Sequence, residues 1–118
     1  MELKRLDFIG SSRDNLKEFP DEVRQDIGYA LFEVQKGEKP AGAKPLKGFG
    51  GAGVLEIIED FIGDAYRAVY TVKFAKVVYV LHCFQKKSKS GIKTPQHEID
   101  LIKQRLKAAE EDYKSHYK

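Results

Sequence analysis

The stretch VVYVLHCF at residues 77–84 is the feature that most limits how this chain folds. It is apolar at odd and even positions alike, so a β-strand here presents apolar side chains to both faces of its sheet. Such a strand favours a central place in a sheet that is covered on at least one side. It then ends abruptly in Gln85-Lys86-Lys87, which brings positive charge to the edge of the core.

Two predicted strands precede this one, and a predicted helix follows it. Alternation over residues 65–74 puts Tyr66, Tyr70 and Phe74 on one face of its strand and Arg67 on the other. Residues 54–59 form a shorter strand, and tight connections predict that the three strands pair antiparallel. The pair Thr94-Pro95 predicts a helix start. Apolar residues then continue at helical spacing: Ile99, Ile102, Leu106 and Ala109.

The first third of the chain predicts a strand over residues 2–8 and then a helical hairpin. A short helix covers residues 14–19, and a second begins after Pro20. Its apolar stripe consists of Val23, Ile27, Ala30, Leu31 and Val34. The order is β-α-α-β-β-β-α, a single α+β domain over residues 1–118. We expect a small antiparallel sheet with an N-terminal helical hairpin and a C-terminal helix.

Charge is distributed unevenly along the 118 residues, although the net charge is only +3. No acid lies between Asp64 and Glu98, and that interval carries seven Lys and Arg residues. A positive surface of this kind suits a polyanion such as RNA, or it only confers solubility. The Gly-rich segment 37–53 adds Lys44 and Lys47, as a functional loop or as a plain connector.

Several classes of protein are not indicated. No apolar run has the length of a membrane span, and no signal peptide is visible, so we expect a cytoplasmic protein without a membrane partner. Cys83 is the only cysteine, and the histidines lack the spacing of metal ligands. We therefore expect no disulfide, no metal site and no cofactor.

A phosphate site is predicted where two strands meet. In a hairpin that turns near residues 75–76, Arg67 lies opposite positions 84–85, so it converges with Lys86 and Lys87. If the tyrosines pack on the helices, Arg67 points to an open face of the sheet. A guanidinium beside ammonium groups can hold a phosphate and stabilise its extra charge during cleavage. The alternative is that Arg67 forms a cross-strand ion pair with Glu56 or Glu59.

Further residues are weaker candidates for the same role. His97, in the first turn of the last helix, is a candidate participant in proton transfer. Five other lysines are candidate RNA contacts: Lys44, Lys47, Lys73, Lys89 and Lys93.

The segments AYRAVYTV, VVYVLHCFQKKSKSGIKTPQHEID and LIKQRL resemble the phage-derived HigB-like branch of the RelE/ParE toxin superfamily. The resemblance spans about residues 15–110 and includes PLKGFGGAGVLEI. It implies the toxin of a type II toxin–antitoxin system, an endoribonuclease that cleaves mRNA on the ribosome. It also implies a helix-turn-helix antitoxin as the partner, with DNA reached only through that antitoxin.

The resemblance assigns catalytic roles to Arg67, Lys86 and Lys87, and a matching place to Lys47 in the Gly-rich loop. One position departs from the family pattern, because Ile58 stands where a further arginine is often found. The alternative function is therefore a binding protein on the same scaffold, either a gyrase-directed toxin like the ParE branch or an inactive partner of an antitoxin.

Overall fold

The computed structural model describes residues 3–51, 53–87 and 94–117. Its elements are β1 (Arg5–Phe8), α1 (Ser12–Lys17), α2 (Asp21–Gln35), β2 (Lys44–Pro45), β3 (Val54–Phe61), β4 (Asp64–Thr71), β5 (Val77–Lys87) and α3 (Gln96–His116). The predicted α+β order is confirmed, and the two-residue strand β2 is added to it.

The five strands form one sheet in the order β1-β5-β4-β3-β2, so the predicted central strand β5 lies between β4 and β1. Strands β3 to β5 pair antiparallel, as expected, and the added strand β2 pairs antiparallel with β3. Strand β1 differs, because it pairs parallel with β5, with Arg5 opposite Val77. Local sequence patterns do not specify this pair, since its members lie far apart in the chain.

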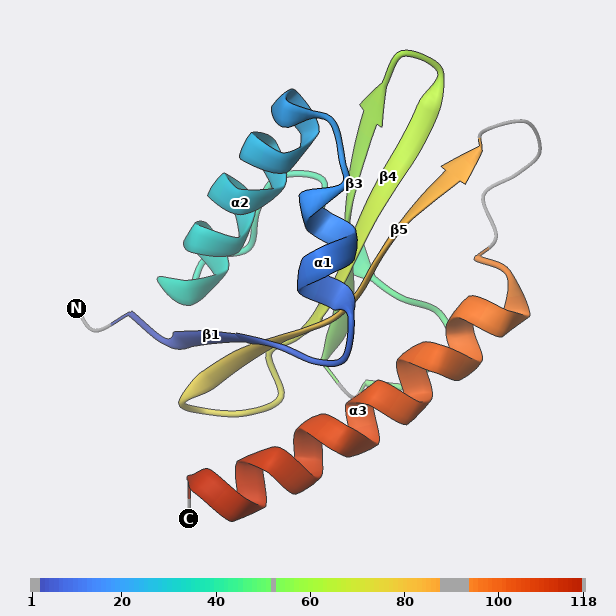
Figure 1. Cartoon of the computed structure of the whole chain (residues 1–118). Coiled ribbons are helices and arrows are strands. Elements are labelled where there is room, and N and C mark those ends of the chain that lie inside the picture. The colour runs from blue at the N-terminus through green and yellow to red at the C-terminus, as the bar shows by residue number, and fades with distance from the viewer. Residues whose placement is uncertain (1–2, 52, 88–93, 118) are drawn as a thin grey trace.

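Helices cover both faces of the sheet (Figure 1). Helices α1 and α2 lie on one face, where the α2 stripe packs with Tyr66, Ala68 and Tyr70. Helix α3 lies on the other face, where Ile102 and Ala109 pack against strand residues. The expectation of an open face beside Arg67 is therefore wrong. A strand that is apolar on both faces needs a cover on each, and α3 supplies the second.

A β-bulge in β5 changes which side chains reach α3. Val69 pairs with His82, whereas the next residue, Tyr70, pairs with Val80, so Leu81 is the extra residue. A bulge interrupts the strict alternation of side chains. Leu81 belongs to the cluster under α3, and the ring of His82 also bonds to side chains of α3.

Strand β4 is shorter than predicted. It ends at Thr71, so the alternation does not extend to Phe74. Phe74 packs beneath α3 with Tyr79 and Tyr113, and not on the face of Tyr66. In the Gly-rich segment, β2 pairs with β3, and Leu46 is buried in the cluster under α3.

Candidate functional site

Arg67 is buried beneath α3, with only 5% of its surface exposed. Its Nη1 donates to both carboxylate oxygens of Glu56, at 3.1 and 3.3 Å, and to Thr94 Oγ1 at 3.3 Å. The side chain of Glu56 is equally buried, at 4% exposed. The predicted alternative, an ion pair with Glu56, is thus confirmed. Thr94 precedes α3, so the start of that helix helps to cover the arginine.

The strand register arranges four charged residues in a diagonal row. Lys44 lies opposite Glu56. Arg67 lies opposite Ile58, two residues beyond Glu56. Lys86 lies opposite Ala65, two residues before Arg67. Diagonal neighbours in a sheet are within reach of long side chains. We call Lys44, Glu56, Arg67 and Lys86 the charged row.

Arg67 and Lys86 influence each other electrostatically, as their predicted convergence requires. Arg67 lies opposite Phe84, at the predicted register. Desolvation and then the charge of Arg67 lower the pKa of Lys86, while the Glu56 carboxylate raises it in part. A positive neighbour makes a second positive charge less favourable, so Arg67 adds to the effect of desolvation on the Lys86 pKa.

The other predicted lysines are dispersed. Lys47 is exposed in the loop after β2. Lys87 is the last residue of β5, with its backbone opposite Asp64. Lys73 lies at the far end of the sheet, where it pairs with Glu110 of α3. Lys89 and Lys93 lie outside the described residues.

The length of α3 shows how far Lys73 lies from the charged row, because its partner Glu110 is near the far end of that helix. Glu110 lies about 18 Å along the helix from Glu98, at about 1.5 Å per residue. Glu98 is near the end of α3 that covers Arg67, and Glu110 is near the other end. The structure therefore brings Arg67 and Lys86 together, places Lys44 beside Glu56 at the opposite end of the charged row, and separates Lys73 from the row.

A second polar cluster beneath α3 was not predicted from the sequence. His82 Nε2 lies 2.8 Å from Glu98 Oε1, and Arg105 Nη1 lies 3.2 Å from His82 Nδ1. Because the guanidinium can only donate, His82 Nδ1 accepts and Nε2–H donates to Glu98. Arg105 also donates to the carbonyl of Leu81 at 3.0 Å and to Ser11 Oγ at 3.0 Å. Arg105 thus joins α3 to the bulge and to the loop before α1.

His82 is held in its neutral form. Burial lowers its pKa, and the hydrogen bond and charge of Glu98 offset this only in part. Arg105 and His97 lower it further. His97 itself is exposed, with Nε2 3.9 Å from Glu98 Oε1. It stays a candidate for proton transfer, whereas His82 is a packed structural residue.

We expect the buried His82 to make the fold sensitive to acid. In the unfolded chain its pKa is about 6.5. Below that pH the unfolded state therefore binds a proton more readily than the native state does, because the native pKa is lower. Its contribution to the free energy of unfolding is complete above that pH and is lost as the pH falls. His82→Gln should reduce the pH slope of stability below pH 6.5, by at most about 1.4 kcal/mol per pH unit.

Urea unfolding of both proteins between pH 5 and 8 measures this slope. The comparison must be made against the parent protein, because Glu59 gives stability a pH dependence of the opposite sign to that of His82. Burial and a hydrogen bond with Asp26 raise the pKa of Glu59 to about 7, so its contribution to stability is lost as the pH rises through 7. His116→Gln, at the other end of α3 and exposed, is the control. A slope that is the same in His82→Gln and the parent would contradict the assignment.

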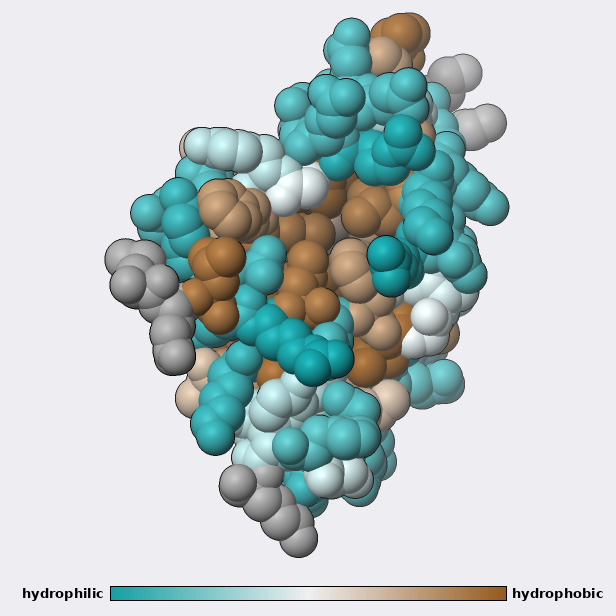
Figure 2. Space-filling view, turned by 60° about the vertical axis from the view of Figure 1, so that its left-hand side comes forward, coloured by the Kyte–Doolittle hydropathy of each residue, from teal (hydrophilic) through white to brown (hydrophobic). Residues whose placement is uncertain are grey.

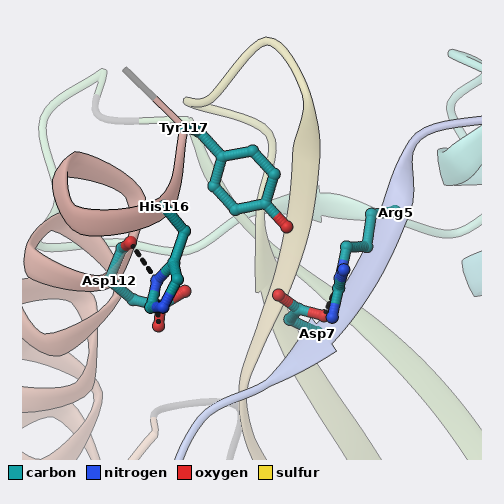
Figure 3. A pocket seen from close by; sticks show the side chains of 5 residues that line it. All are labelled: Arg5, Asp7, Asp112, His116 and Tyr117. Carbon is teal, nitrogen blue, oxygen red and sulfur yellow. Dashed lines mark hydrogen bonds and ion pairs between the residues drawn. The ribbon is translucent and has the colours of Figure 1, made fainter.

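A hollow of about 340 Å³ lies away from the charged row, between β1 and the last turn of α3. In Figure 3, Arg5 and Asp7 of β1 face Asp112, His116 and Tyr117. Arg5 is already paired with Asp7 at 2.8 Å, and Asp112 accepts from Tyr79 at 2.6 Å. Two carboxylates beside one paired arginine do not suit a phosphate.

Among the described residues, no group of three or more His, Cys, Asp or Glu side chains is arranged to hold a metal ion. In the same part of the chain, no helix is both long and apolar enough to cross a bilayer.

Comparisons with known proteins identify relatives of this chain. The family described as Phage derived protein Gp49-like (DUF891) matches residues 14–107. A mutant of the E. coli toxin RelE in the free state is similar in structure, with a TM-score of 0.58, 22% identity and coverage of 92% of this chain and 98% of that chain. A chain of the RelBE2 toxin–antitoxin complex from Mycobacterium tuberculosis gives a TM-score of 0.51 and 20% identity, over 75% of this chain and 97% of that one. No curated protein matches the sequence significantly. At these identities, the two structures show a shared fold.

Proposed function

We propose, because this chain belongs to the phage-derived Gp49-like family and has the fold of RelE toxins, that it is the toxin of a type II toxin–antitoxin system. We propose further that it acts in the cytoplasm by cleaving mRNA on the ribosome.

The charged row is the observation that carries this proposal. Three of its four residues, Lys44, Arg67 and Lys86, are cations. Arg67 and Lys86 are diagonal neighbours, and Arg67 bonds to Thr94 just before α3, while Lys44 lies beside Glu56 at the other end of the row. RNA cleavage builds negative charge on the phosphate in the transition state, and fixed cations stabilise that charge. Lys47, exposed in the loop that follows Lys44, extends the positive surface along the RNA backbone.

Lys86 and His97 are the groups proposed to transfer protons in this reaction. A lowered pKa makes Lys86 a readier proton donor than an ordinary lysine, which suits the oxygen that leaves on cleavage. Arg67 would hold the phosphate, and Lys86 would protonate the leaving oxygen. His97 is exposed nearby, in the first turn of α3, and it is the second candidate for proton transfer.

A helix-turn-helix antitoxin is the proposed partner, and the outer face of α2 is a suitable docking surface. Tyr29 and Phe32 are exposed there, and Gly28 has open space around it. A glycine in the exposed interior of a helix lowers stability, and its small size lets another backbone approach closely. Figure 2 turns the left-hand side of Figure 1, where α2 lies, toward the viewer, and the face in view carries apolar side chains in its middle, bordered by hydrophilic ones.

The proposal is tested by expressing the protein without an antitoxin in growing bacteria. We expect growth to stop and primer extension on a reporter message to show new 5′ ends inside the coding region. Co-expression of the helix-turn-helix protein encoded beside it should restore growth. Intact mRNA in arrested cells would contradict the proposed RNA cleavage.

A second candidate function is favoured by the burial of Arg67. An arginine that is paired with Glu56 and 5% exposed is not presented to RNA in this state. Ile58, opposite it in the register, adds no further cation. A gyrase-directed toxin, or an inactive toxin fold that only binds its antitoxin, would fit that state. Arrest with blocked DNA replication would indicate the former, and unimpaired growth the latter.

A further inference from the structure

In its ion pair with Glu56, Arg67 donates to the carboxylate through only one of its nitrogens. A strong arginine–carboxylate pair has two parallel hydrogen bonds of about 2.7–2.9 Å. Here one nitrogen, Nη1, serves both carboxylate oxygens at 3.1 and 3.3 Å. Arg67 Nε is buried and has no hydrogen-bond partner among the described residues. The pair therefore leaves a buried donor unsatisfied, which is costly in the interior of a protein.

The surroundings of Glu56 favour additional negative charge. Arg67 and Lys86 lie on one side of it in the charged row, and Lys44 lies opposite it on β2. Only one carboxylate belongs to the row, so the row carries a net positive charge before any ligand binds. An incoming anion would reduce the repulsion between Arg67 and Lys86 that lowers the lysine pKa.

We propose that the charged row is an oxyanion site in which the Glu56 carboxylate takes the place of a phosphate group. In the free protein, Glu56 holds Arg67 by Nη1. A phosphate from RNA, or free phosphate, competes for the guanidinium and engages Nε, which the carboxylate leaves unpaired. Glu56 thus compensates the buried arginine until the ligand arrives, and it weakens phosphate binding. This inference rests on the proposed function of the same site and names what controls it.

Glu56→Gln tests the competition, because the amide has the same size and removes only the negative charge. We expect inorganic phosphate to bind the variant at least tenfold more tightly than the parent in isothermal calorimetry. A short all-deoxy oligonucleotide, which lacks the 2′-hydroxyl needed for cleavage, should gain affinity as well. Tighter binding of phosphate alone would assign the site to free phosphate, and tighter binding of both phosphate and the oligonucleotide would assign it to a nucleic-acid phosphate. Either result would overturn a purely structural role for Glu56.

Two further variants separate this effect from others. Glu110→Gln removes a carboxylate from the pair with Lys73 at the other end of α3, and its phosphate affinity should equal that of the parent. Combining Glu56→Gln with Arg67→Lys should abolish the gain, because Arg67 is the proposed receptor. If Glu56→Gln does not fold, Glu56→Asp, which draws the carboxylate back by one methylene, should show a larger thermal stabilisation by phosphate than the parent.

The comparison of phosphate affinity between Glu56→Gln and the parent does not depend on whether the protein is toxic. A protein that cleaves no RNA but binds phosphate more tightly in Glu56→Gln would retain this inference and lose the proposed function. A toxic protein whose phosphate affinity is the same in parent, Glu56→Gln and Glu110→Gln would retain the function and overturn the inference.

Discussion

Arg67→Ala is expected to abolish growth arrest and to lower the free energy of unfolding by about 3–5 kcal/mol. The loss of activity follows from its proposed contact with the phosphate, since a lost charge-stabilising donor slows cleavage by about two to three orders of magnitude. The loss of stability follows from Glu56, which would be left buried without its cation. Strand alternation alone suggests an exposed arginine of little importance for folding, and the structure corrects that expectation.

The two losses can be separated by replacing the whole pair. Apolar residues of similar volume often replace a buried ion pair at little or no cost. The double variant Glu56→Leu/Arg67→Met should therefore regain most of the stability lost in Arg67→Ala, while it remains non-toxic. Urea unfolding and an inducible toxicity assay measure the two properties. An Arg67→Ala protein that is folded and fully toxic would remove Arg67 from the site.

Arg67→Lys is expected to keep the fold and still lose most of the activity. Lysine retains the positive charge that Glu56 requires, so the free energy of unfolding should fall much less than in Arg67→Ala. One ammonium group does not reproduce the planar fork of donors that holds a phosphate. We expect cleavage to fall about 100-fold, on the scale of a lost transition-state donor.

The matched control for this exchange is Arg24→Lys, a surface arginine on α2 that pairs with Asp21. It should leave both toxicity and unfolding unchanged. Toxicity is best measured as the inducer concentration that halves the growth rate. If Arg67→Lys were as toxic as the parent, a single positive charge would suffice, and the fork would have no role.

Much of the local structure was predictable, because it depends on neighbouring residues. The stripe of α2 is buried as predicted, and α3 begins immediately after Pro95. The register that sets Arg67 opposite Phe84 agrees with the predicted position, but it depends on the bulge at Leu81, because the pairing nearest the turn, Thr71 with Tyr79, would alone set Arg67 opposite Cys83. The chain belongs to the phage-derived Gp49-like family and has the fold of RelE toxins, while the catalytic roles of Arg67, Lys86 and Lys87 stay predictions.

The long-range arrangement was harder to predict. The position of α3 decides whether Arg67 is open or buried, and the helix stripe alone does not say which face of the sheet it covers. The apolar residues on both faces of β5 were the available indication that neither face is open. The cluster of His82, Glu98 and Arg105 depends on a bulge at Leu81, and an unbroken alternation gives no sign of it.

The parallel pairing of β1 with β5 also has a consequence for the order in which the protein is made. Arg5 can pair with Val77 only after β5 has been synthesised, and α3, which covers Arg67, is synthesised after β5. Contacts between distant segments form late, because a long loop must close first. A nascent chain therefore cannot assemble the charged row under its helix before α3 has been synthesised. If the protein attacks translated messages, this order of folding protects the ribosome that is making it up to that point.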